Sequence, residues 1–147
     1  MNARLGVVIA LICTSLNAFA QPIARTPIYG GVGAPNNGVA SNSENHLNAP
    51  TIPLGCTIDA GSAIPADAYV PVYAGTATSN YRVLSNFNMH LSGATEHIGM
   101  LSKRPIVGGT QIYAGIGAKN NKVLSQYSGH MNDTTEPYGW TMPCPRS

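Results

Sequence analysis

The sequence predicts an all-β domain made of three internal repeats, and three observations support this. The first is a fixed frame: residues 27–57, 71–101 and 111–141, here named copies one, two and three, align without a gap. The second is the abundance of glycine and proline, 16 and 11 residues, which leaves few windows for a long helix. The third is the alternation of apolar with small or polar residues around asparagine-rich turns in each copy.

Eight of the 31 aligned columns are identical in all three copies. They are Tyr29/Tyr73/Tyr113, Gly31/Gly75/Gly115, Asn36/Asn80/Asn120, Val39/Val83/Val123, Ser41/Ser85/Ser125, His46/His90/His130, Thr51/Thr95/Thr135 and Gly55/Gly99/Gly139. A fixed period of this kind indicates one supersecondary unit repeated until neighbouring units cover each other. We therefore expect residues 21–147 to form a single domain.

Copy two illustrates the elements expected in each repeat. A first strand ends at Gly75, and residues 77–80 supply a turn, because asparagine tolerates the left-handed backbone that tight turns require. A second strand runs over residues 81–87, a polar bend surrounds His90, and a third strand ends near Gly99. The predicted order is strand, turn, strand, bend, strand.

A helical alternative exists in the same region, because Leu84, Phe87 and Leu91 recur at three- and four-residue steps. Asparagine and serine crowd this run and favour turns over helix interiors. The sequence therefore favours strands, with at most one short helical turn after the Val-Leu-Ser segment of each copy.

The segments outside the copies are short. Residues 21–26 are expected to form a terminal arm. The spacers, residues 58–70 and 102–110, combine apolar residues with Gly or Pro, a pattern typical of a strand flanked by turns.

Three copies of this size cannot each hold a core alone, but they can close around a pseudo-threefold axis with every strand edge paired. In period, copy number and size, such a body resembles a β-trefoil or the related β-prism. The Gln-x-Trp signature of ricin-type lectin trefoils and the Gln-x-Asp-x-Asn-x-Val-x-Tyr signature of monocot mannose lectins are both missing. No sugar-binding residue of either family can therefore be transferred to this chain.

The first twenty residues have the order of a secretory signal peptide. Arg4 precedes an apolar run over residues 5–13, and Ala18-Phe19-Ala20 is an A-x-A-like cleavage site. The apolar run is about half the 18 residues that a membrane span needs. We expect cleavage after Ala20, a mature chain without a transmembrane segment, and a secreted or periplasmic location.

Two cysteines, Cys56 and Cys144, remain after this cleavage. In an exported chain such a pair most simply forms a disulfide, which contributes roughly 2–4 kcal/mol by restricting the unfolded state. Neither cysteine has a histidine at the short spacing of a metal site.

Charge excludes some functions. Charged residues make up 10% of the chain and the formal net charge is +2. Basic residues are scattered, whereas nucleic-acid binding needs a clustered basic face, so no nucleic-acid partner is expected. The six acidic residues form no pair at catalytic spacing, and a site repeated three times favours multivalent binding over catalysis. We therefore expect no enzyme activity and no cofactor.

The repeated histidines His46, His90 and His130 are the sharpest candidate site residues. Three interpretations remain open: each closes a bend by bonding to the backbone, each belongs to a ligand pocket in its own copy, or all three converge on the axis and hold zinc. The first is favoured over the other two.

The ligand-pocket interpretation adds the repeated asparagines and tyrosines, because aromatic faces and amides are the usual contacts to a sugar. The candidate ligand-binding residues are His46, His90, His130, Asn36, Asn80, Asn120, Tyr29, Tyr73 and Tyr113.

The sequence thus predicts a secreted, non-enzymatic, lectin-like module that binds glycan or another cell-surface polymer through repeated sites. The alternative is a secreted protein-binding factor, such as an inhibitor, immunity protein or adhesin subunit, that uses the spacer loops. An extracellular hydrolase is a third reading. Asn132-Asp133-Thr134 is an N-glycosylation acceptor if the source is eukaryotic.

Overall fold

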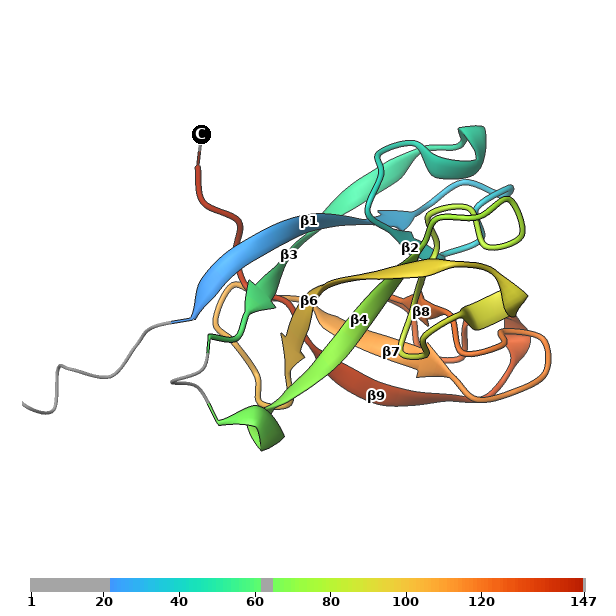
Figure 1. Ribbon diagram of the computed structural model, residues 1–147. Coiled ribbons are helices and arrows are strands. Elements are labelled where there is room, and N and C mark those ends of the chain that lie inside the picture. The colour runs from blue at the N-terminus through green and yellow to red at the C-terminus, as the bar shows by residue number, and fades with distance from the viewer. Residues whose placement is uncertain (1–21, 62–64, 147) are drawn as a thin grey trace, which may run out of the picture.

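The computed structural model describes residues 22–61 and 65–146. Within these ranges the chain is all-β: one antiparallel sheet of nine strands, accompanied by short 3-10 turns and by no α-helix (Figure 1). The predicted signal peptide, residues 1–20, lies outside the described residues. The described part contains no helix that is long and apolar enough to cross a membrane.

Each copy has the same order of elements: a long strand, a two-residue strand, a 3-10 turn and a second long strand. The strands are β1 (Ile23–Gly31), β2 (Ala40–Ser41), β3 (Thr51–Asp59), β4 (Tyr69–Gly75), β5 (Leu84–Ser85), β6 (Thr95–Ser102), β7 (Gln111–Gly115), β8 (Leu124–Ser125) and β9 (Thr135–Trp140). The 3-10 turns are η1 (His46–Asn48), η2 (Ala66–Ala68), η3 (His90–Ser92) and η4 (His130–Asn132).

The two long strands of each copy form an antiparallel hairpin, β1 with β3, β4 with β6 and β7 with β9. The short strand pairs with the first long strand through the repeated tyrosine and serine, as in Tyr73↔Ser85. This strand is shorter than residues 81–87 predicted. Tyr81 and Arg82 have φ angles of 24° and 64°, outside the strand region, so pairing starts only at Leu84.

Backbone bridges join the copies at both ends of the hairpins. Where β3, β6 and β9 approach the spacers, the bridges are Ile58↔Met100, Ser102↔Trp140 and Cys56↔Met142. At the opposite end, which holds the loops around β2 and β8 on the right of Figure 1, they are Ser41↔Val83, Ser85↔Val123 and Val39↔Ser125. Each copy is therefore bridged to both others.

The core draws on matching columns of the three copies. Ile28, Val72 and Ile112 are fully buried and belong to one cluster together with Leu84 and Leu124. A second cluster contains Val39, Val83 and Val123, which occupy one identical column. Burial of each valine or isoleucine side chain contributes about 1.5–3 kcal/mol, so these matching positions stabilise the packing of the copies against one another.

Cys56 and Cys144 form the predicted disulfide, with a sequence separation of 88 residues. It fixes the chain after β9 to β3 of copy one. Close by, Cys56 and Met142 exchange two backbone hydrogen bonds, of 2.8 and 3.0 Å.

Two sequence predictions about connecting segments were wrong. Residues 23–26 are not a terminal arm: they form the start of β1, and Thr26 bonds to Thr57 and Ile98. The described residues of the two spacers contain no separate strand. Residues 58–59 end β3, residues 69–70 begin β4, and residues 103–110 form turns, because their Gly and Pro content interrupts strand pairing.

Candidate functional site

The repeated asparagines hold the first loop of each copy from inside. Asn80 is 1% exposed, accepts a hydrogen bond from the Ala77 amide at 3.0 Å, and donates to the carbonyls of His90 and Ala94, both at 3.0 Å. Asn36 and Asn120 make the same three bonds in their own copies. The amide therefore ties the first loop to the second, and none of its polar atoms is left for a ligand.

The repeated histidines are also buried. In each copy Nδ1 lies 3.2 Å from the carbonyl three residues earlier, that of Ser43, Phe87 or Tyr127. His46 Nε2 lies 2.9 Å from the Val39 carbonyl. The bend-closing interpretation describes this geometry. Desolvation by burial lowers the pKa of His90 and of His130, opposed by their backbone hydrogen bonds.

The zinc interpretation finds no site in the described part of the chain: nowhere in residues 22–61 or 65–146 do three or more His, Cys, Asp or Glu side chains gather closely enough to hold a metal ion. Each repeated histidine is directed to carbonyls of its own copy.

The remaining repeated polar residues have local roles. Tyr29, Tyr73 and Tyr113 are half-buried on the first long strands; the Tyr73 ring lies 5.6 Å from that of His97, and the Tyr113 hydroxyl donates to Gln111. The repeated serines accept from the amide two residues later, and the repeated threonines from the amide six residues earlier. The identical columns thus build the loops.

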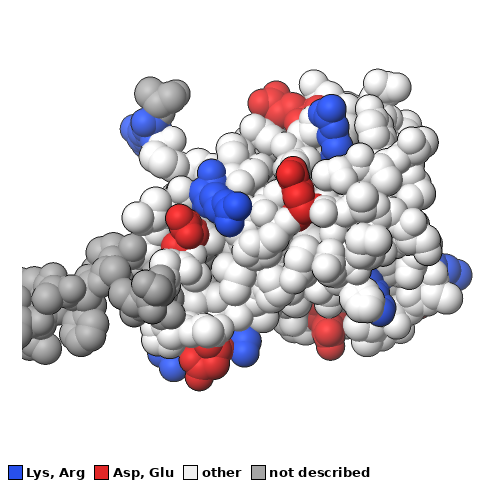
Figure 2. All heavy atoms as spheres, viewed as in Figure 1, with Lys and Arg blue, Asp and Glu red and all other residues white. Residues whose placement is uncertain are grey.

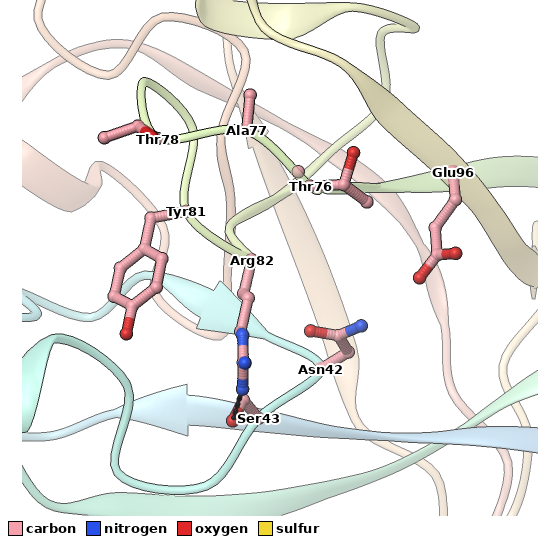
Figure 3. Close-up of a pocket in the computed structure, with 9 residues that line it drawn as sticks. Asn42, Ser43, Thr76, Ala77, Thr78, Tyr81, Arg82 and Glu96 are labelled. Carbon is pink, nitrogen blue, oxygen red and sulfur yellow. Dashed lines mark hydrogen bonds between the residues drawn. The ribbon is translucent and has the colours of Figure 1, made fainter.

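A cleft at the junction of copies one and two is lined mainly by residues that differ among the copies. We name it the Arg82 cleft; it has a volume of about 750 Å³ and lies where the loop after β2 of copy one meets the first loop of copy two. Its polar side chains, drawn in Figure 3, are Asn42, Ser43, Thr76, Thr78, Tyr81, Arg82 and Glu96.

The Arg82 side chain crosses from copy two to copy one. Its Nη1 donates to Ser43 Oγ at 3.0 Å, and its Cζ lies 5.8 Å from the centroid of the Tyr81 ring. Figure 3 shows the guanidinium directed to Ser43, with the Tyr81 ring to one side. Tyr81 is 52% exposed. An aromatic face, a cation and several hydrogen-bonding groups therefore border one open cleft.

The two other junctions between copies use the same columns with different residues. Between copies three and one, a cleft of about 260 Å³ is lined by Gly38, Tyr127 and Met131, and a side chain at Gly38 would collide with the Tyr127 ring. Between copies two and three, Lys122 Nζ lies 3.6 Å from the centroid of the Phe87 ring. The column Gly38/Arg82/Lys122 thus gives each junction its own chemistry.

Sequence reasoning singled out identical columns and so missed Tyr81, Arg82, Glu96 and Asn42. A signal was present: copy one has glycine at the position of Arg82, next to paired asparagines. Glycine and asparagine indicate a left-handed backbone there, and a large side chain in that conformation at Tyr81 or Arg82 is uncommon.

Charged side chains are few on the face of the molecule in Figure 2; acidic and basic groups adjoin at its lower left, and neither sign forms a large patch there. No family model, no curated protein and no solved structure matches this chain.

Proposed function

We propose that the protein is a secreted, non-enzymatic, lectin-like module that binds a glycan or cell-surface polymer in the Arg82 cleft. In this proposal residues 21–147 form one domain, with three lobes arranged about a pseudo-threefold axis in a trefoil-like or prism-like body. The cyclic bridges among Val39, Val83 and Val123 and their neighbours support that arrangement. The disulfide is compatible with an extracellular location after cleavage at Ala20.

The observation that carries the proposal is the composition of the Arg82 cleft. Sugars are bound by an aromatic face against the ring together with charged and amide groups that bond to its hydroxyls. The cleft offers the exposed Tyr81 ring, the Glu96 carboxylate, the Asn42 amide and the Thr76 hydroxyl. Its volume lies within the usual range for small-ligand sites, about 300–1,000 Å³.

The repeated asparagines and histidines have a supporting role in this proposal. Asn80 fixes the loop that carries Tyr81 and Arg82, and His46 closes the bend that follows Asn42 and Ser43. Replacing them would reduce binding by loosening the walls of the cleft, together with a loss of stability.

A glycan array screened with the purified mature protein tests the proposal, followed by calorimetric titration of the best saccharide. Tyr81→Asn removes the aromatic face and installs the residue that the other two copies carry, at a backbone position that asparagine tolerates. Glu96→Gln removes the negative charge of the carboxylate and replaces one of its two acceptor oxygens by an amide donor. We expect each to weaken binding about tenfold, which corresponds to about 1.4 kcal/mol.

Glu136→Gln is the matched control, because Glu136 occupies the column of Glu96 in copy three and does not line the Arg82 cleft. It should leave the affinity unchanged. An array without any bound saccharide, or equal losses in all three variants, would contradict the proposal.

The protein-binding alternative is favoured by one observation. Val107, in the second spacer, is 98% exposed and precedes Gly108, whose φ is 80°, so the turn presents an apolar tip. A protein partner that uses the spacers would lose affinity with Val107→Ser and be indifferent to Tyr81→Asn.

A further inference from the structure

We propose that the saccharide bound in the Arg82 cleft is acidic, and that Arg82 binds its carboxylate. This inference rests on the proposed function and specifies its ligand class. Three observations support the inference. They are the partners of the Arg82 guanidinium, the backbone conformation at Arg82, and the position of Glu96 in the same cleft.

The guanidinium has a partner in copy one and further donors that this partner does not use. A guanidinium has five N–H donors, and Arg82 directs Nη1 to Ser43 Oγ at 3.0 Å while the Tyr81 ring lies beside it at 5.8 Å. Arginine pairs with carboxylates through two parallel hydrogen bonds, and a prepositioned fork loses less side-chain entropy when it does so. Arg82 is exposed to the cleft, so its remaining donors are accessible to a ligand.

The backbone at Arg82 is strained for a residue with a side chain. Its φ is 64°, and the matching position in copy one is Gly38 at 74°. A non-glycine residue in this conformation costs about 1 kcal/mol relative to glycine. The column has a positive φ in all three copies, so the loop geometry directs whichever side chain stands there and the residue type sets the chemistry of the junction. The energetically easier glycine occurs at the junction of copies three and one, where the described residues that line the cleft include neither Lys nor Arg.

Lys122 is the second cation in this column, with φ of 67°, but its ammonium already lies 3.6 Å from the Phe87 ring centroid. The Lys122 ammonium therefore already has the Phe87 ring as its partner at that junction. At the junction of copies one and two, Ser43 stands in the column of Phe87 and takes a single donor from Arg82. At this junction the cleft is therefore open, and Arg82 retains hydrogen-bond donors that Ser43 does not use.

Glu96 limits the charge of the ligand. In the view of Figure 3 the Asn42 amide lies between Arg82 and Glu96. A carboxylate there accepts hydrogen bonds from hydroxyl groups and repels a second anion. The cleft therefore fits a sugar with one carboxylate at the Arg82 end and hydroxyl groups at the Glu96 end, such as a hexuronic acid residue.

Isothermal titration with a matched set of saccharides tests this. The set is a disaccharide ending in glucuronic acid, its methyl ester, the glucose counterpart and a 6-sulfated glucose counterpart. We expect the acid to bind at least tenfold more tightly than the ester and the glucose form, and its affinity to fall as salt is raised. Arg82→Gly should remove this preference, and Arg82→Lys should restore it in part.

Arg82→Gly also relieves the backbone strain, so its unfolding midpoint in urea should not fall, which separates lost binding from lost folding. Lys122→Gly is the matched control and should keep the preference for the acid. Equal binding of acid, ester and glucose form would overturn the inference and leave the proposed function standing. Tighter binding of the sulfated form, or loss of the preference in Lys122→Gly, would also overturn it. Binding of no saccharide would overturn both proposals.

Discussion

Replacing Asn80 by alanine removes the tie between the two loops of copy two. The three hydrogen bonds of the side chain, to Ala77, His90 and Ala94, are each 3.0 Å long; the one to His90 is buried and the other two are partly buried. At about 1 kcal/mol for each bond, the free energy of unfolding should fall by about 3 kcal/mol. A domain of this size is stabilised by about 5–15 kcal/mol. The variant should therefore fold, but its unfolding midpoint should lie at a clearly lower urea concentration.

Asn80→Asp refines the prediction, because it retains the acceptor for the Ala77 amide and replaces the donor group by carboxylate oxygen. That oxygen would face the carbonyls of His90 and Ala94. At neutral pH we therefore expect Asn80→Asp to lower the free energy of unfolding more than Asn80→Ala does. When the carboxyl is protonated, the decrease should be smaller. Urea unfolding followed by circular dichroism measures both. Thr78→Ala, exposed in the same loop, is the control and should change the free energy by less than about 0.5 kcal/mol. A loss below about 1 kcal/mol in Asn80→Ala would refute the role assigned to this side chain.

Two further predictions concern the whole domain. Replacing Cys56 and Cys144 by serine should cost about 2–4 kcal/mol, because the disulfide joins segments 88 residues apart; an unchanged urea midpoint would contradict this. Burial lowers the pKa of His90 and His130, so below about pH 6.5 the unfolded chain binds protons that the folded chain does not. The free energy of unfolding should therefore fall as the pH drops below this value. Urea titrations between pH 7.5 and 5 test this, and the slope should be smaller in His130→Gln.

The sequence was sufficient for the β class and for the disulfide. Fixed glycines such as Gly55 and Gly99, with φ of 111° and 136°, occur where L side chains are strained, so their recurrence reports backbone geometry directly. The pairing of Cys56 with Cys144 followed because no other cysteine remained after the predicted cleavage.

The candidate site was harder to predict, because repetition identifies what the copies share. Asn80 and His90 recur because every copy must close the same two loops. A cleft between copies needs side chains that reach from one repeat to the next, as Arg82 does to Ser43. Such contacts depend on how the copies are arranged in space, and an alignment of the three copies does not show that arrangement.

Chemical-shift mapping tests the central claim most directly. An isotope-labelled mature chain is titrated with a saccharide selected on the array, and each backbone amide is followed. The account predicts shifts concentrated at residues 42–43, 75–82 and 96, the walls of the Arg82 cleft. Shifts concentrated in residues 58–70 and 102–110, or spread equally over the matching loops of all three copies, would contradict it.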